Sequence, residues 1–242
     1  MNAKEKICIA LDCDSSEHAL QIVESVRNDI GFYKIGLQLF TREGPQIVHQ
    51  VIALGCKVFL DLKLHDIPNT IQKSVESLVQ LGVSLFTIHT SGGVKMMMAA
   101  ASAAKATAEK CHCDKPLVIG VTVLTSLSDN ILAKELNVTR PLEQHVSHLA
   151  LLAQQAGLDG VVASPHEIQT IRNACGPYFK IITPGIRPTW ASESHDQSRI
   201  MTPQDAIKKG ADMIVIGRPI TESNQPRKSA EQLRQDIEQL VL

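Results

Sequence analysis

The sequence has almost no excess charge of either sign, with 24 Lys and Arg residues against 25 Asp and Glu residues and a formal net charge of −1. Proteins that bind nucleic acid or an anionic membrane through charge need a basic surface, and this balance favours neither partner. The sequence also lacks a long apolar run. The stretch 7–11 is too short for a signal peptide and leads straight to Asp12, while the stretch 96–108 contains Lys105 and is shorter than a membrane span. These absences predict a cytoplasmic protein.

A metal centre and disulfides also lack support in the sequence. Cys8, Cys13 and Cys56 lie in or beside apolar segments, where a free cysteine behaves as a small hydrophobic residue. The segment 111–113 (Cys-His-Cys) resembles half of a metal site, but no second pair of ligands follows at a spacing typical of zinc. We therefore expect reduced thiols and no metal ligands.

What the sequence does contain is a repeated alternation of short apolar runs with amphipathic stretches. The runs are rich in Val and Ile and do not alternate with polar residues, which is typical of strands covered on both faces. They span 7–11, 32–35, 57–62, 85–89, 117–123, 160–163, 180–183 and 213–216, and amphipathic helical patterns between or after them include 15–27, 67–81, 141–156 and 230–240.

Eight strand–helix units without a linker predict a single α/β domain over residues 1–242, a (β/α)8 or TIM barrel. The length agrees, because such barrels usually take about 250 residues. The alternative is an open doubly wound sheet, but no G-x-G-x-x-G motif follows the first apolar run. We therefore favour the barrel.

In such a barrel the active site lies at the C-terminal ends of the strands. The residues that the sequence places in or just after those ends are Asp12, Lys34, Asp61, Lys63, His89, Thr125, the segment 184–187 (Pro-Gly-Ile-Arg), Gly217 and Arg218. Charged and polar residues thus gather where the predicted architecture places chemistry.

The most informative group is Lys34, Asp61, Lys63 and Asp66. Because side chains alternate along a strand, Asp61 and Lys63 are expected to point the same way, with the intervening leucines facing the packing. Two lysines and two carboxylates in a small space must pair, because buried charges need compensation. This group is our candidate catalytic site, whereas we expect supporting or structural roles for His65 and His89.

Two further features indicate a phosphate. Gly217-Arg218 follows the last predicted strand, where glycine lets the backbone approach a ligand and arginine pairs with phosphate through two hydrogen bonds. Barrels often bind phosphate in the loops after strands seven and eight. The polar stretch 187–202, which contains Trp190, is long for such a loop and indicates either a lid that closes over the phosphate or a disordered segment.

At these positions the chain resembles the orotidine 5′-phosphate decarboxylase family. The resemblance extends over nearly the whole chain, and the Asp61–Thr70 block is its most specific part. The matching segments are Ala10-Leu-Asp12, Tyr33-Lys-Ile-Gly36, Asp61-Leu-Lys-Leu-His-Asp-Ile-Pro-Asn-Thr70, Val121-Thr-Val-Leu-Thr-Ser126, Thr183-Pro-Gly-Ile-Arg187, Asp196-Gln197 and Ile216-Gly-Arg-Pro219.

The resemblance implies a cofactor-free decarboxylation of orotidine 5′-phosphate to UMP in pyrimidine biosynthesis. Lys63 would protonate C6 of the pyrimidine, Asp61 and Asp66 would flank the departing carboxylate, and Lys34 would complete the array. The family further implies a homodimer in which Asp66 and Thr70 reach into the partner's site. The implied catalytic residues are Lys34, Asp61, Lys63 and Asp66, and the implied substrate-binding residues are Asp12, Lys34, Asp61, Thr70, Thr125, Pro184, Arg187, Gln197, Gly217 and Arg218.

Within the binding set, the resemblance gives each group a part of the nucleotide. Asp12 and Thr70 would hold ribose hydroxyls, and Thr125 would contact the base. The phosphate would be bound by Arg218, the Gly217 backbone and Gln197, with Arg187 close to it.

Three other functions remain open from the residues alone. Metal-dependent sugar-phosphate decarboxylases or aldolase-like synthases share the Asp-x-Lys-x-x-Asp pattern, but Lys34 stands where they place a magnesium ligand, and an ammonium beside a dication is unfavourable. A Schiff-base aldolase would use Lys63 as its nucleophile. A non-catalytic sensor of a phosphorylated ligand would have no need of the full charged array.

Overall fold

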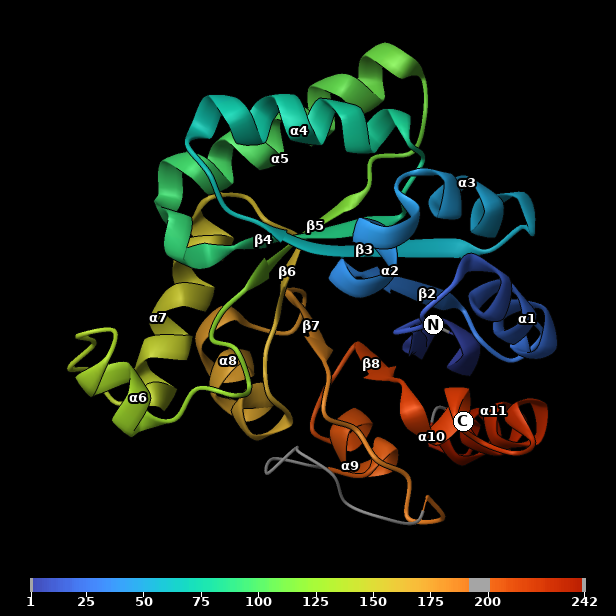
Figure 1. Ribbon diagram of the computed structural model, residues 1–242. Helices are drawn as coiled ribbons and strands as arrows, with labels where there is room; N and C mark the ends of the chain where they lie inside the picture. The colour runs from blue at the N-terminus through green and yellow to red at the C-terminus, as the bar shows by residue number, and fades with distance from the viewer. Residues whose placement is uncertain (1, 192–200, 241–242) are drawn as a thin grey trace.

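The fold is a closed barrel of eight parallel strands in the order β1 to β8, with β8 paired to β1 (Figure 1). This computed structural model describes residues 2–191 and 201–240. The predicted barrel is confirmed. The strands are β1 Ile7–Ala10, β2 Phe32–Gly36, β3 Lys57–Leu64, β4 Leu85–His89, β5 Leu117–Val121, β6 Gly160–Val162, β7 Lys180–Thr183 and β8 Met213–Ile216.

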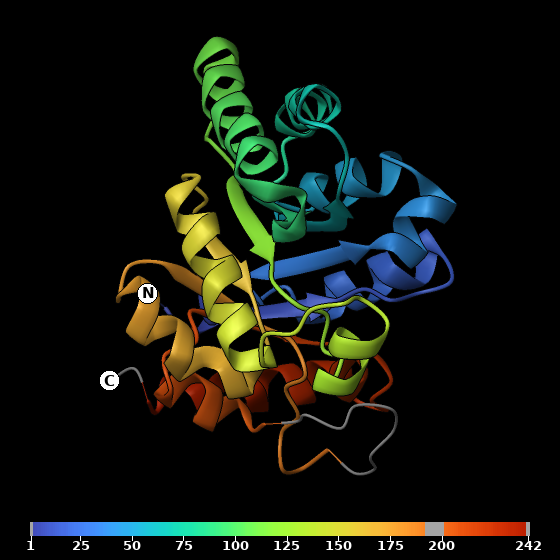
Figure 2. The same cartoon turned by 90° about the vertical axis from the view of Figure 1, so that its left-hand side faces the viewer.

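Helices surround the barrel, and neighbouring helices pack in pairs, such as α4 with α5 and α7 with α8 (Figures 1 and 2). The α-helices are α1 Ser16–Val26, α2 Leu37–Glu43, α3 Gln46–Ala53, α4 Pro68–Gln80, α5 Gly93–Cys111, α6 Asp129–Lys134, α7 Leu142–Gln155, α8 Ile168–Cys175, α9 Pro203–Lys208, α10 Arg218–Thr221 and α11 Pro226–Glu238. Short 3₁₀ turns occur at η1 Ala3–Lys6, η2 Thr90–Gly92 and η3 Pro165–Glu167. None of the helices in the described part of the chain is long and apolar enough to cross a membrane.

Local sequence explains where several helices begin. Ser15 accepts a hydrogen bond from the backbone N–H of His18 at the start of α1, and Thr202 accepts one from Asp205 at the start of α9. Each bond satisfies a donor that the helix itself leaves open. Helix α1 therefore starts within one residue of the helical pattern that the sequence predicts from residue 15.

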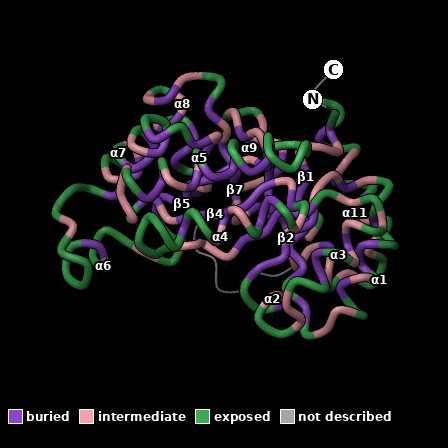
Figure 3. The backbone as a smooth tube through the Cα atoms, turned by 90° about the horizontal axis from the view of Figure 1, so that it is seen from above, coloured by how far each residue is buried: buried purple, intermediate pink, exposed green. Residues whose placement is uncertain are grey.

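The hydrophobic core has two parts, and the strands lie at its centre (Figure 3). The larger cluster lies between the barrel wall and the helices, where most buried helical side chains are found. The smaller cluster consists of inward-facing strand residues: Cys8, Ala10, Phe59, Leu85, Ile119, Ile182, Met213 and Val215. Because strand side chains alternate, the next inward positions along β3 and β4 are Asp61 and Thr87, so a polar layer follows the apolar one.

The third strand is not the regular strand that simple alternation predicts. Its pairing with β4 shifts between Leu60, which faces Phe86, and Leu64, which faces Ile88. Lys63 lies within this shift and has a φ of 52°, in the left-handed region. Three residues of β3 therefore stand opposite the single residue Thr87, which makes this a bulge.

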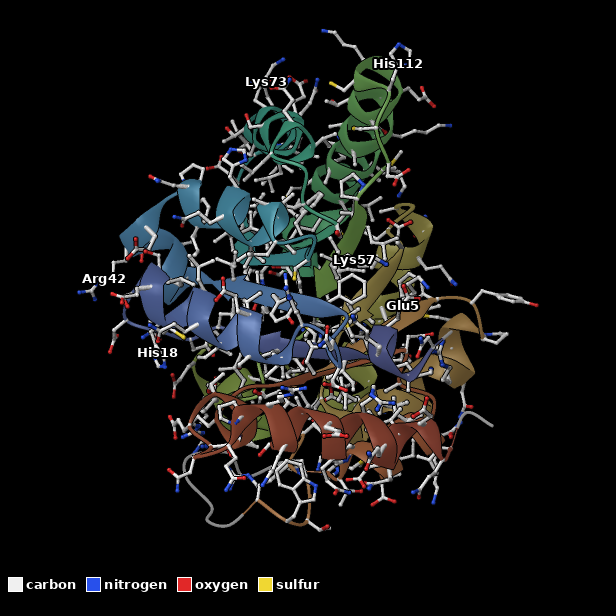
Figure 4. The ribbon with its side chains drawn as sticks, turned by 90° about the vertical axis from the view of Figure 1, so that its right-hand side faces the viewer. Glu5, His18, Arg42, Lys57, Lys73 and His112 are labelled. Carbon is white, nitrogen blue, oxygen red and sulfur yellow. The ribbon has the colours of Figure 1, made fainter. Side chains whose placement is uncertain are left out.

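The six cysteines are all free thiols, three of them buried. Cys111 and Cys113 are exposed at the end of α5, and His112 between them lies at the outer tip of that helix (Figure 4). Within residues 2–191 and 201–240, no three His, Cys, Asp or Glu side chains are grouped so that they would hold a metal ion.

Candidate active site

Four charged side chains, three in β2 and β3 and one just after β1, form one cluster at the C-terminal end of the barrel. The ammonium of Lys63 lies 2.8 Å from Asp61 Oδ2. The ammonium of Lys34 lies 3.8 Å from the same oxygen and 3.1 Å from Asp12 Oδ1. The structure thus brings together Asp12, Lys34, Asp61 and Lys63, in an alternating row of carboxylates and ammonium groups.

Burial increases toward the middle of this row. The side chains of Lys34 and Asp61 are 13% and 12% exposed, whereas those of Lys63 and Asp12 are 29% and 54% exposed. Opposite unit charges about 4 Å apart attract by about 4 kcal/mol at an effective dielectric constant of about 20. The contacts therefore hold both ammonium groups in place, and Lys63 is the more exposed of the two lysines.

Asp61 is also bound from β4, by a residue that sequence reasoning missed. The hydroxyl of Thr87 donates a hydrogen bond of 2.8 Å to Asp61 Oδ1 and accepts one of 2.9 Å from the backbone N–H of Lys63. Thr87 is fully buried. The only sequence signal for it was its inward-facing position two residues before His89.

Gly36, at the end of β2, provides space for the lysine that precedes it. A Cβ atom at this position would lie 2.8 Å from Lys34 Nζ and 3.4 Å from Asp12 Oδ1. Any larger residue would therefore displace the Lys34–Asp12 contact. The sequence shows this glycine, but not its role. That role depends on the position of the Lys34 ammonium beside it, which only the structure gives.

Asp66 and Thr70 do not join the cluster within one protomer. Both are exposed, and Asp66 Oδ1 accepts a hydrogen bond of 2.7 Å from the backbone N–H of Ile67, just before α4. The described contacts include no ion pair between Asp66 and either Lys34 or Lys63. The intramolecular array therefore contains Asp12 in addition to Asp61, and not Asp66.

Two histidines lie beside the charged cluster. The ring centroids of His65 and His89 are 5.5 Å apart. Burial lowers the pKa of the His89 imidazole from its usual value, and the neighbouring His65 and Lys63 lower it further, while Asp61 opposes them. Neutral His89 is thus favoured next to the Lys63 ammonium.

The two predicted phosphate-binding arginines line one cavity of about 470 Å³. Arg187 follows β7, and Arg218 begins α10 directly after β8, with Gly217 as the N-cap residue. Trp190 lines the same cavity and donates a hydrogen bond of 3.2 Å from its indole N–H to Asp236 on α11. The Lys34–Asp61–Lys63 cluster is not among the cavity's lining residues, so the two sites adjoin different strand ends.

The remaining predicted residues lie at the same end of the barrel. Pro184 is half-buried immediately after β7, and Thr125 is half-buried in the turn that follows β5. The two ends of the predicted lid are hydrogen-bonded to each other, since the Arg187 N–H donates a hydrogen bond of 2.9 Å to the Met201 carbonyl. Gln197 and the greater part of the 187–202 stretch lie outside the described residues.

Comparison with known proteins shows the family to which the chain belongs. Residues 5–233 match the family described as "Orotidine 5'-phosphate decarboxylase / HUMPS family". A protein named orotidine 5'-phosphate decarboxylase from Moorella thermoacetica is 46% identical over 238 residues, or 98% of this chain and 94% of that protein. A crystal structure of orotidine 5'-phosphate decarboxylase from Lactobacillus acidophilus has a TM-score of 0.85 and 34% identity, covering 96% of this chain and 98% of that chain. The chain therefore belongs to the orotidine 5'-phosphate decarboxylase / HUMPS family.

Proposed function

We propose that the protein decarboxylates orotidine 5′-phosphate to UMP in the cytoplasm, as a step of pyrimidine biosynthesis, with no cofactor. Family membership supports the reaction class. The observation that carries the mechanism is the Lys63 ammonium, held 2.8 Å from Asp61 at the open end of the barrel.

The reaction needs a cation at the carbon that loses its carboxylate. When the C6–carboxylate bond breaks, carbon dioxide leaves and the electron pair stays on C6 in an sp² orbital that no neighbouring π-system accepts. The Lys63 ammonium stabilises this pair electrostatically and then donates a proton to C6, which completes UMP. The neutral amine left behind recovers its proton from water.

Asp61 and Lys34 prepare Lys63 for this role. Asp61 fixes the position of the ammonium by a short ion pair. Lys34 lies 3.8 Å from the same Asp61 oxygen and balances the second negative charge that the substrate's carboxylate brings. Repulsion between Asp61 and that carboxylate is a secondary contribution in this mechanism.

The phosphate supplies binding energy at a distance from the reacting carbon. The largest enzymatic accelerations correspond to about 20 kcal/mol, while one preorganised donor contributes about 3–4 kcal/mol. A single lysine therefore needs help from remote contacts. We assign the phosphate to Arg187, Gln197, Gly217 and Arg218.

The other proposed contacts reach the ribose and the base. Asp12 and Thr70 bind ribose hydroxyls, and Thr125 contacts the base, with Pro184 beside the substrate. Asp12 already lies 3.1 Å from Lys34, which links the ribose contact to the charged cluster. Substrate binding would thus orient the same lysine that neighbours Asp61.

We further propose that the protein works as a symmetric homodimer. Asp66 and Thr70 are exposed, as expected for residues that complete a partner's site. Four large apolar side chains are also exposed in the segments that follow β2, β3, β4 and β5. A two-fold interface at this end of the barrel would cover them. They are Leu37, Ile67, Met98 and Leu124.

The function is tested by incubating the purified protein with orotidine 5′-phosphate and EDTA and following the loss of the substrate's ultraviolet absorbance. We expect rapid loss with the wild type and essentially none with Lys63→Ala. Lys73→Ala is the matched control, because Lys73 is an exposed lysine on α4 that pairs with Glu76 (Figure 4).

Other outcomes would favour the alternatives. Failure of the well-folded wild type to act on this substrate, with turnover of a sugar phosphate on adding Mg²⁺, would replace the proposal by the metal-dependent reaction. Trapping of Lys63 by borohydride in the presence of a ketose phosphate would indicate a Schiff-base aldolase. Binding of the nucleotide without turnover would indicate a sensor.

A further inference from the structure

We infer that Thr87 is a positioning residue for the proposed reaction, because it couples the backbone of Lys63 to the carboxylate of Asp61. The inference rests on the proposed function and adds a residue outside the charged array. Thr87 lies in the middle of β4, is fully buried, and is the one residue of that strand opposite the bulge in β3.

The Thr87 hydroxyl forms two bonds at once. It accepts from the Lys63 N–H at 2.9 Å and donates to Asp61 Oδ1 at 2.8 Å. A hydroxyl has one proton to donate, so the donation to Oδ1 leaves the other carboxylate oxygen for the lysines. That oxygen, Oδ2, lies 2.8 Å from Lys63 Nζ and 3.8 Å from Lys34 Nζ.

These bonds close a ring that runs from the Lys63 backbone through Thr87 and Asp61 to the Lys63 ammonium. The ring holds an unfavourable conformation, because Lys63 has a φ of 52°, in the left-handed region that L-residues rarely adopt. The site is buried, so an unmet N–H or carboxylate oxygen there would be costly. Thr87 therefore decides both the backbone angle and the carboxylate orientation that aim the ammonium.

Two substitutions separate this role from simple packing. Thr87→Val keeps the side-chain shape and removes the hydroxyl, whereas Thr87→Ser keeps the hydroxyl and removes a methyl group. We expect Thr87→Val to lower kcat by about 100-fold with KM within about threefold, since a displacement of about 1 Å in a catalytic group can cost that much. Thr87→Ser should keep kcat within about fivefold. The reverse order, with valine active and serine impaired, would mean that Thr87 only fills space.

Crystal structures of the wild type and Thr87→Val give a second readout that does not depend on turnover. We expect the Lys63–Asp61 contact to lengthen beyond about 3.5 Å, the limit of a hydrogen bond, or the Lys63 φ to become negative in the valine variant. An unchanged contact and an unchanged φ would overturn the inference. If Thr87→Val does not fold, a loss of kcat in Thr87→Ser as large as about 100-fold would also overturn it.

The two proposals fail in different ways. A wild-type protein that does not decarboxylate orotidine 5′-phosphate removes the proposed function, and the crystallographic comparison then still decides whether Thr87 sets the geometry of Lys63. A wild-type protein that is active beside an equally active Thr87→Val variant removes the positioning role alone.

Discussion

Asp61 binds Lys63 directly, with 2.8 Å between Oδ2 and Nζ, although only one residue separates them in the sequence. In a regular strand, residues two apart lie on the same face, but their side chains run parallel and do not point toward each other. Here the left-handed backbone at Lys63 turns the second side chain toward the first. The same Asp61 oxygen also lies 3.8 Å from Lys34, so one carboxylate organises two cations.

This arrangement predicts strong coupling between Asp61 and Lys63 in the free energy of unfolding. We expect Asp61→Asn to destabilise the protein by about 1–3 kcal/mol, because it leaves two ammonium groups with less compensation. In a double-mutant cycle with Lys63→Met, measured by urea unfolding, the coupling should exceed about 1 kcal/mol.

The exposed Lys73–Glu76 pair on α4 provides the matched control cycle, with Lys73→Met and Glu76→Gln. Its nitrogen–oxygen distance is 3.0 Å, but the lysine side chain is 65% exposed. We expect a coupling of about 0.5 kcal/mol or less there. Equal coupling in the two cycles would contradict a special role for the less exposed Asp61–Lys63 pair.

Removing Arg218 should reduce activity by more than the loss of one hydrogen bond explains. If phosphate binding energy supports the reaction at C6, Arg218→Ala should lower kcat/KM by well over tenfold in a steady-state assay with orotidine 5′-phosphate. Arg42→Ala is the control, because Arg42 is exposed on α2 and points away from the protein (Figure 4). A loss below about tenfold for Arg218→Ala would argue against this coupling.

A charge at Ile67 should dissociate the proposed homodimer. The Ile67 side chain is 67% exposed between Asp66 and α4, so an interface that brings Asp66 and Thr70 to the partner's site would bury it. We expect Ile67→Asp to shift the protein from dimer to monomer in sedimentation equilibrium and to reduce activity with it. Tyr178→Asp is the control, since Tyr178 is 95% exposed in the connection between α8 and β7.

A dimer that survives Ile67→Asp unchanged would place the interface elsewhere. A wild-type protein that is monomeric at all concentrations would remove the homodimer from the proposal altogether.

His89 should make the protein less stable in mild acid. Its pKa lies below the usual 6.5 because burial, His65 and Lys63 disfavour the imidazolium more than Asp61 favours it. Above about pH 6.5 the folded and unfolded chains both hold neutral His89, so its contribution is complete. As the pH falls further, the unfolded chain is protonated first, and stability is lost until the pH passes the lowered folded pKa.

Urea unfolding of His89→Gln between pH 7 and 5 checks this prediction. The decline in the free energy of unfolding should be shallower than in the wild type, by up to about 1.4 kcal/mol per pH unit. His145→Gln offers an independent comparison on α7, because burial, with Arg140 and His148, also lowers the pKa of His145. Identical pH profiles for the wild type and His89→Gln would rule out the effect.

Much of the fold was predictable because it depends on local periodicity. Apolar runs and amphipathic stretches indicate strands and helices wherever the chain folds, and eight such units favour a closed barrel. The structure confirms that barrel, with strand ends that differ from the predicted ones by a few residues. The sequence also placed Lys34, Asp61 and Lys63 at one end of the barrel, because parallel strands bring their C-terminal ends together.

By itself, then, the sequence determined the barrel and the end at which the charges gather, whereas contacts between distant segments decided the geometry. The left-handed Lys63, the Thr87 hydroxyl that binds it and the space beside Gly36 all depend on how neighbouring strands pair. The sequence pattern grouped Asp66 with Lys34, Asp61 and Lys63. In the structure Asp66 lies outside the intramolecular cluster, since the chain turns into α4 there. Spacing along the chain indicates the face of a strand or helix on which a side chain lies. Only the tertiary structure decides which atoms that side chain contacts.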